Sequence, residues 1–128
     1  MHIAVVGLSH RTAPVEVREK LSIQEELLEK SFNNLKKIDQ ILEVSILSTC
    51  NRLEIYSLVK DPQLGIEAIK SFLLDFSGLD NKTLSPHLFN FVQEKAVSHV
   101  MRVSAGLDSL VLGEGQILSQ VKKMVRLG

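Results

Sequence analysis

The single cysteine of the chain lies in the segment Ser48–Arg52, which joins two apolar runs. Cys50 follows the run Val44–Leu47 and stands among small polar residues, with Arg52 two positions further on. A cysteine attacks in its thiolate form, which nearby cationic groups favour. Arg52 could supply that positive charge, or its planar guanidinium could hold a carboxylate. The alternative interpretation is that Cys50 is a small residue in a tight hairpin turn.

A second residue with suitable chemistry is His99, which lies between Val97 and Val100 in a helical pattern. An imidazole exchanges protons near neutral pH, so His99 could act as a general acid or base on a substrate of Cys50. A cysteine nucleophile and its histidine are usually far apart in the sequence. The alternative is a structural histidine at the boundary of the core, which is the commoner role of a lone histidine in a helix.

The segment Leu107–Gln116 mixes apolar and polar residues without a clear period. It could form a pocket wall, because its two glycines let the backbone approach a ligand closely. The polar side chains of Ser109, Glu114 and Gln116 would then converge on that ligand. The alternative is an irregular loop followed by a helix cap.

Neither a dinucleotide site nor a metal site is expected in this chain. Gly113 and Gly115 provide the first two glycines of a dinucleotide-binding motif, but Leu118 occupies the position of the third and no clear strand precedes them. We therefore exclude a nicotinamide or flavin site here. The histidines also lack the spacing of metal ligands on a helix; they are His2, His10, His87 and His99.

The overall charge identifies no partner, since the chain has 15 basic and 15 acidic residues. This balance neither indicates nor excludes an RNA-linked substrate. A single cysteine excludes an internal disulfide and a cysteine-based zinc site, which favours a reducing compartment. The N-terminus has no basic segment followed by an apolar stretch, so we expect no secretory signal, and no apolar run reaches the about 20 residues of a membrane span. We therefore expect a cytoplasmic protein without a membrane partner.

The first third of the chain is predicted to contain a strand and a long helix. The apolar residues Ile3, Val5 and Val6, which lead into Gly7, predict an opening strand, followed by a turn-rich segment at Ser9–Pro14. Ser22 and Glu25 match a capping box, which predicts that a helix begins there and continues to about Lys37.

A hairpin and a second helix are predicted next. The strands Leu42–Ser48 and Leu53–Val59 are separated by four residues, which indicates an antiparallel hairpin. Asp61, followed by proline, is typical of a helix start, and Gly78 is typical of its end. The remaining segments are predicted to be a loop at Asp80–Pro86, a strand at Leu88–Val92 and a helix at Lys95–Ala105. A last amphipathic helix is predicted at Gln116–Arg126.

This β-α-β-β-α-β order predicts an α+β fold of the ferredoxin-like, split β-α-β type. We expect residues 1–93 to form a sandwich with an antiparallel sheet and helices on one face. Residues 94–128 are expected to form a helical extension of the same domain. Because the sequence ends directly after a helical pattern, we expect it to be part of a longer protein.

Four blocks of the sequence resemble the N-terminal catalytic domain of glutamyl-tRNA reductase, in the order found in that family. Together they cover nearly the whole chain, which makes the resemblance specific. Some members of the family carry proline where Gly115 stands here. The blocks are Gly7–Pro14 (GLSHRTAP), Leu47–Tyr56 (LSTCNRLEIY), Ala96–Val103 (AVSHVMRV) and Ala105–Lys122 (AGLDSLVLGEGQILSQVK).

The resemblance implies an enzyme that reduces glutamyl-tRNA with NADPH to glutamate-1-semialdehyde, the entry step of five-carbon tetrapyrrole (porphyrin) biosynthesis. It makes Cys50 the nucleophile that forms a thioester, and His99 the residue that assists catalysis. The residues that it implies for the glutamyl pocket are Thr49, Asn51, Arg52, Ser109, Glu114, Gly115, Gln116 and Gln120.

In this family, an NADPH-binding domain and a dimerising helical domain follow the catalytic domain. The resemblance therefore implies that this chain binds no cofactor itself and that the full-length enzyme is a homodimer. Two other functions stay open at this stage. One is a stand-alone cysteine esterase or acyltransferase, and the other is a non-catalytic ferredoxin-like interaction module with a buried, structural Cys50.

Overall fold

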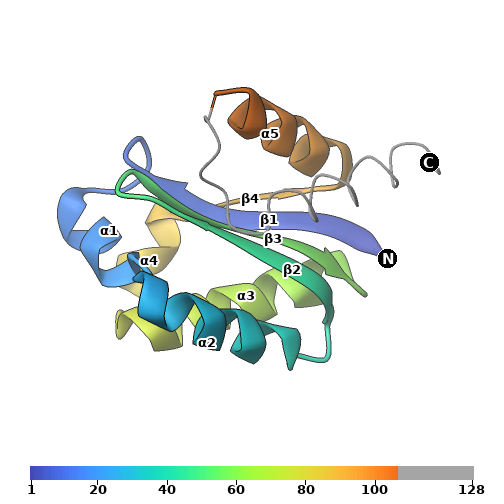
Figure 1. Cartoon of the computed structure of the whole chain (residues 1–128), viewed down its shortest axis with the longest axis horizontal. Coiled ribbons are helices and arrows are strands. Elements are labelled where there is room, and N and C mark those ends of the chain that lie inside the picture. The colour runs from blue at the N-terminus through green and yellow to red at the C-terminus, as the bar shows by residue number, and fades with distance from the viewer. Residues whose placement is uncertain (107–128) are drawn as a thin grey trace.

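The computed structural model describes residues 1–106, with the side chains of residues 1–103. These residues form an α+β fold in which helices cover a four-stranded antiparallel sheet (Figure 1). The predicted segment Leu107–Gly115 and the predicted helix Gln116–Arg126 lie outside the described residues.

The sheet contains β1 (His2–Ser9), β2 (Ile41–Ser48), β3 (Arg52–Val59) and β4 (Phe89–Val92). Its strand order is β2-β3-β1-β4, and each neighbouring pair is antiparallel. Strands β1 and β2 therefore run in the same direction with β3 between them. All four predicted strands and the predicted hairpin are confirmed.

Helices lie on both faces of the sheet (Figure 1). Four helices cover one face: α1 (Val15–Leu21), α2 (Glu25–Lys36), α3 (Pro62–Ser77) and α4 (Asn81–Leu84), the last followed by a 3-10 turn at Ser85–His87. Helix α5 (Gln93–Gly106) packs against β1 and β4 on the other face. The expectation of helices on one face concerned residues 1–93 and agrees with α1–α4, whereas α5 belongs to the expected helical extension and packs on the other face. The chain reverses between β4 and α5 at Gln93, whose φ is 54°, and this turn directs α5 across the sheet.

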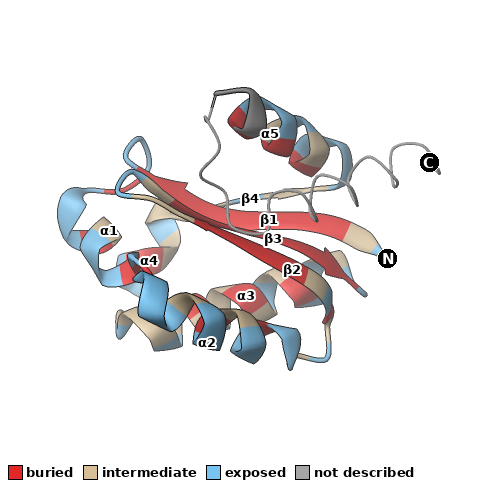
Figure 2. Ribbon diagram, in the orientation of Figure 1, coloured by how far each residue is buried: buried red, intermediate tan, exposed pale blue. Residues whose placement is uncertain are grey.

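Each face of the sheet has its own apolar core, because side chains alternate along the strands. On β1, Ala4, Val6 and Leu8 face α1–α4, whereas Ile3 and Val5 lie beneath α5. The central strands are consequently buried on both sides (Figure 2). A sheet covered on both faces requires nearly continuous apolar runs, as β1 has.

The capping box predicted at Ser22 and Glu25 is wrong. Ser22 follows α1, a helix that the sequence pattern did not reveal, and α2 starts after Gln24 without a side-chain cap. With seven residues, α1 is too short for a helical period to stand out, although Val17 and Leu21 are buried one turn apart.

Both ends of α3 are as predicted. Asp61 accepts a hydrogen bond at 2.9 Å from a backbone N–H in the first turn, and Gly78 ends the helix in the left-handed region at φ 71°. The loop predicted at Asp80–Pro86 is wrong, because Asp80 caps the short helix α4 and accepts from the Thr83 N–H at 2.8 Å. Hydrogen bonds from Thr83 hold the pKa of Asp80 below its ordinary value.

Candidate active site

Cys50 is a free, exposed cysteine at the tip of the β2–β3 hairpin. The Thr49 hydroxyl accepts from the backbone N–H groups of Asn51 and Arg52 at 3.2 and 3.1 Å. The Thr49 N–H donates to the Arg52 carbonyl at 2.8 Å. Cys50 therefore shares a tight turn with three of the predicted pocket residues, Thr49, Asn51 and Arg52.

The β1–α1 region holds the hairpin tip in place. Arg18 of α1 donates from Nη1 to the Cys50 carbonyl and from Nε to the Ala13 carbonyl, both at 3.2 Å. The His10 N–H donates to the Asn51 carbonyl at 2.8 Å. The backbone around Cys50 is thus fixed while its thiol stays accessible, which differs from the buried thiol that an interaction module predicts.

Glu54 is a fully buried carboxylate on β3, and its side chain has three polar partners. Its Oε1 contacts His99 Nε2 of α5. Its Oε2 accepts from Arg52 Nη1 at 3.3 Å and from the Tyr56 hydroxyl at 2.9 Å. A buried charge is tolerated only when it is paired and hydrogen-bonded, and these three partners meet that requirement.

The strand geometry explains how these groups meet. Arg52, Glu54 and Tyr56 alternate along β3 and therefore project from the same face, towards α5. Gly7 of β1 stands opposite Glu54 in the sheet register. A Cβ on Gly7 would lie 2.9 Å from Glu54 Cγ and 2.5 Å from the backbone carbonyl oxygen of the preceding Leu53. The missing side chain of Gly7 thus leaves the space that the Glu54 side chain occupies.

His99 connects this carboxylate to an aromatic cluster. Its side chain is only 15% exposed. Its ring lies 5.2 Å from the Phe89 ring and 5.0 Å from the Phe91 ring, between centroids. Nε2 is engaged by Glu54, while Nδ1 has no hydrogen-bond partner among the described side chains of residues 1–103. His99 thus lies at the boundary of the core, while its role as a general acid or base stays a prediction.

Tyr56 completes the network as a donor. Burial, then the charge of Glu54 and the hydrogen bond to it, raise the pKa of Tyr56 above its ordinary value, although Arg52 acts in the opposite direction. The phenol therefore keeps its proton and continues to donate to Glu54.

Several predicted residues are not brought together in the described part of the chain. Cys50 and His99 make no hydrogen bond with each other, and the Arg52 guanidinium pairs with Glu54 rather than with the thiol. The remaining predicted pocket residues lie outside the described residues: Ser109, Glu114, Gly115, Gln116 and Gln120.

The sequence reasoning missed Glu54, Tyr56 and Arg18. Two signals pointed to Glu54: it is the only charged residue in the run Leu53–Val59, and a glycine interrupts the apolar strand β1. A glycine inside a strand often marks a close approach of another group. No sequence signal identified Arg18, because its role depends on where α1 packs.

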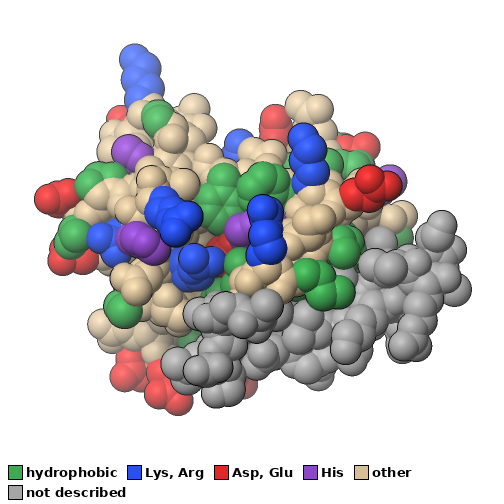
Figure 3. Space-filling view, turned by 90° about the horizontal axis from the view of Figure 1, so that it is seen from above, with side chains coloured by type: hydrophobic (Ala, Val, Ile, Leu, Met, Phe, Trp, Pro, Cys, Tyr) green, Lys and Arg blue, Asp and Glu red, His purple; other side chains and the backbone are tan. Residues whose placement is uncertain are grey.

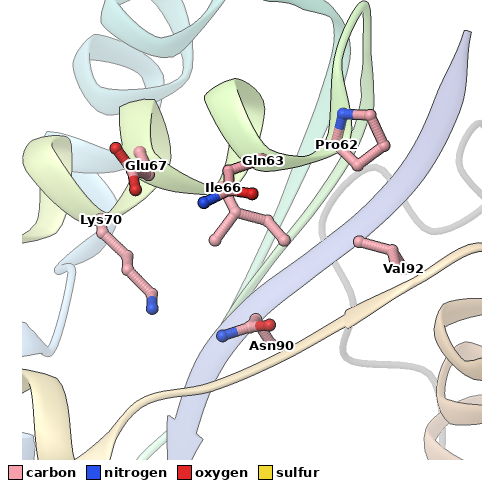
Figure 4. Close-up of a pocket in the computed structure, with 7 residues that line it drawn as sticks. All are labelled: Pro62, Gln63, Ile66, Glu67, Lys70, Asn90 and Val92. Atoms are coloured by element: carbon pink, nitrogen blue, oxygen red, sulfur yellow. The ribbon is translucent and has the colours of Figure 1, made fainter.

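The surface of the described residues includes the following three hollows. One, of about 340 Å³, separates α3 from β4 on the face opposite α5 (Figure 4). A second, of about 410 Å³, lies between α2 and α3. The third, of about 460 Å³, runs along α5 and includes Phe91, a neighbour of His99. The residues around the first are Pro62, Gln63, Ile66, Glu67, Lys70, Asn90 and Val92.

Among residues 1–106, no group of three or more His, Cys, Asp or Glu side chains is arranged to hold a metal ion. None of the helices in this part of the chain has the length and apolar character needed to cross a membrane.

Several known proteins similar to this chain carry the same description. Residues 6–128 match the family model of the glutamyl-tRNAGlu reductase N-terminal domain. The glutamyl-tRNA reductases of Prochlorococcus marinus (strain NATL2A) and Synechococcus sp. (strain CC9311) are 94% and 70% identical to it over 128 residues, which is all of this chain and 29% of each relative. The solved glutamyl-tRNA reductase from Methanopyrus kandleri has a TM-score of 0.53 and 28% identity, covering 94% of this chain and 26% of that chain. The chain therefore spans less than a third of the length of these relatives.

Proposed function

Since the chain belongs to the family of glutamyl-tRNA reductase N-terminal domains, we propose that it transfers the glutamyl group of glutamyl-tRNA onto Cys50 as a thioester. The observation that carries the proposal is the exposed thiol on a fixed hairpin tip, at the start of the strand that holds Arg52 and Glu54. The complete protein would then reduce this thioester with NADPH to glutamate-1-semialdehyde for tetrapyrrole synthesis. We expect that complete protein to be a cytoplasmic homodimer, with its cofactor and dimer contacts in other domains.

The transfer step follows from the chemistry of a thiolate and an ester. The Cys50 sulfur attacks the ester carbonyl carbon, a C–S bond forms, and the C–O bond to the tRNA ribose breaks. The departing ribose oxygen must take up a proton. We assign this proton to His99, because a carboxylate on one ring nitrogen orients the imidazole and leaves the other nitrogen for proton transfer.

Arg52 is suited to hold the glutamyl side chain. Only its Nη1 is engaged by Glu54, so the remaining N–H groups of the guanidinium are left for the γ-carboxylate of the substrate. Its side chain is 24% exposed, which keeps it within reach of a bound group. Ser109, Glu114, Gly115, Gln116 and Gln120 would complete the glutamyl pocket together with Thr49 and Asn51.

We also assign residues 1–93 to the ferredoxin-like class, with residues 94–128 as a helical extension. The assignment is supported by the strand order, in which β3 lies between the parallel strands β1 and β2.

A deacylation assay tests the proposed transfer. The protein is incubated with glutamyl-tRNA without NADPH, and free glutamate is measured against pH. Without a hydride donor the thioester can only react with water, so we expect slow glutamate release that rises with pH, because the thiolate is the attacking form. Cys50→Ala should reduce release to the rate in buffer and leave the melting temperature unchanged, since the thiol is exposed. Release that persists in Cys50→Ala would show that another group is the nucleophile.

A further inference from the structure

We infer that the hollow along α5 holds the single-stranded 3′ end of the tRNA acceptor while the glutamyl group reacts at Cys50. The inference rests on the proposed function and deepens it, because it identifies the surface that binds the RNA part of the substrate. It follows from the charge of the hollow, its aromatic wall and its position next to His99.

The hollow presents two cations along one stripe of α5. It has a volume of about 460 Å³ and is lined by Glu94, Lys95, Ser98 and Arg102 of α5 and by Phe91 of β4. The α5 side chains in it are all exposed, and two positive charges face one negative charge. At 1.5 Å of rise per residue, Lys95 and Arg102 lie about 10 Å apart along the helix axis, far enough to contact separate phosphates of one strand.

The wall of the hollow provides an aromatic ring. Phe91 is half-buried, with its ring centroid 5.4 Å from that of Phe89 and 5.0 Å from that of His99. Proteins bind single-stranded RNA by combining such rings, on which bases stack, with cations that contact the backbone. The Ser98 hydroxyl adds a donor and acceptor within the same hollow.

The position of the leaving tRNA ribose places the hollow next to the site of thioester formation. The glutamyl ester joins the carbonyl carbon to the ribose of the last nucleotide. If His99 protonates that ribose oxygen, the terminal ribose lies beside His99 and the preceding nucleotides continue past it. Because Phe91 contacts the His99 ring and lines the hollow, the strand would enter the hollow directly.

The other two hollows do not share these properties. Each combines one acid with one base, Glu67 with Lys70 and Asp75 with Lys30, and each lies on the α1–α4 side of the sheet. On the face that carries α5, Lys and Arg side chains gather around an apolar and histidine-bearing centre, while acidic side chains lie mainly towards the rim (Figure 3). The chain has no net charge, so this uneven distribution favours one face for a polyanion.

The test compares two double variants with the same change in charge. Lys95→Ala/Arg102→Ala removes the cations of the α5 hollow, and Lys30→Ala/Lys70→Ala removes two cations from the opposite side. Dissociation constants are measured at several salt concentrations for an acceptor minihelix of glutamate tRNA, with and without its single-stranded 3′ end. For the α5 variant we expect weaker binding of the complete minihelix and a salt slope reduced by about 0.7 for each lost phosphate contact. The control variant should bind like the wild type.

Each outcome decides one question. Wild-type affinity and salt slope in the α5 variant would overturn the inference. An equal loss of affinity for the truncated minihelix would also overturn it, since the cations would then contact the duplex instead of the 3′ end. The proposed function fails separately, if the wild-type protein shows no Cys50-dependent glutamate release.

Discussion

The two faces of the sheet are both closed by helices, but only the face under α5 encloses a charge. The core under α1–α4 includes Leu35, Leu73 and Leu84, all fully buried. The core under α5 includes Ile3, Val5 and Val100, and beside them lies Glu54, which is the sole buried charged residue among residues 1–103. Replacing a buried ion pair with apolar residues is often neutral or stabilising, so stability alone does not account for Glu54. We therefore propose that the α1–α4 face supports the fold and that the α5 face supports the chemistry.

A glycine on each face illustrates the same division. A Cβ on Gly65 of α3 would lie 2.5 Å from Val59 Cγ1, so this glycine lets α3 approach β3 closely. Gly7 instead makes room for the side chain of Glu54. One glycine permits a packing contact, and the other permits a polar network.

The largest effect that distinguishes the faces is expected from His99→Asn. The shorter amide cannot span from α5 to Glu54 and is a poor acid or base, so Cys50-dependent glutamate release should slow by roughly 10²- to 10⁴-fold. His87→Asn is the matched control, because His87 lies beyond α4 and its Nδ1 is hydrogen-bonded to the Thr12 carbonyl, on the side of the sheet opposite α5. A normal release rate in His99→Asn would leave His99 with a structural role only.

Leu73→Ala on the opposite face should give the reverse result. Removing this fully buried side chain should lower the free energy of unfolding by about 2–5 kcal/mol. Glutamate release per folded molecule should stay at the wild-type rate. If both variants changed stability and release together, the two faces would not be separable.

A smaller loss is expected from Glu54→Gln, which keeps the shape of the side chain but removes its charge. A hydrogen bond to a charged group contributes about 1.5–3 kcal/mol, so loss of the orientation of His99 should slow glutamate release roughly 10- to 100-fold. Glu67→Gln, on the opposite face, removes the same charge and should have no effect on release. A Glu54→Gln protein with the wild-type rate would contradict the role of this carboxylate in positioning His99.

The two glycines give a still finer comparison. Gly7→Ala and Gly65→Ala each introduce a Cβ into a closely packed site, and each should lower the free energy of unfolding by about 1–3 kcal/mol. Only Gly7→Ala should also slow glutamate release per folded molecule, because its new methyl group displaces Glu54. Urea titration measures the first quantity and the deacylation assay the second. A slower rate in Gly65→Ala would show that the site depends equally on the packing of α3.

The smallest expected effect is a loss of folding stability at alkaline pH. The pKa of Tyr56 is raised in the folded state, so the unfolded chain loses this proton first as the pH rises above about 10. The stability that Tyr56 contributes is therefore complete below that pH and declines above it, by at most about 1.4 kcal/mol per pH unit. Between pH 9 and 11, wild-type protein should lose more stability than Tyr56→Phe in paired denaturation experiments. If the free energy of unfolding fell equally with pH in the two proteins, the result would contradict a buried phenol beside Glu54.

Most of the sheet could be predicted from the sequence, because the strands are strongly apolar and the hairpin is short. The ends of α3 were predictable for the same reason, since Asp61 and Gly78 act on adjacent backbone groups. Helix α1 and the cap at Asp80 were missed, because short helices depend on tertiary packing more than on a local pattern.

The site was predictable only in part. The residues next to Cys50 in the sequence necessarily lie near it in a tight turn. The approach of His99 to Glu54 depends on α5 crossing the face opposite the other helices, and no local pattern indicated that crossing. Arg52 pairs with Glu54 because residues two apart on a strand project from the same face. This pairing could be inferred from the sequence only by comparing the two side chains.

The most direct test of the central claim is the mass of the peptide that contains Cys50 after the protein is mixed with glutamyl-tRNA and quenched in acid. The account predicts that this peptide carries one added glutamyl group, attached at the thiol and removed by hydroxylamine. The adduct should be absent in Cys50→Ala and should form more slowly in His99→Asn. A glutamyl group on any other residue, or no adduct while glutamate is released at the wild-type rate, would contradict the proposed thioester and with it the assignment of the α5 face to catalysis.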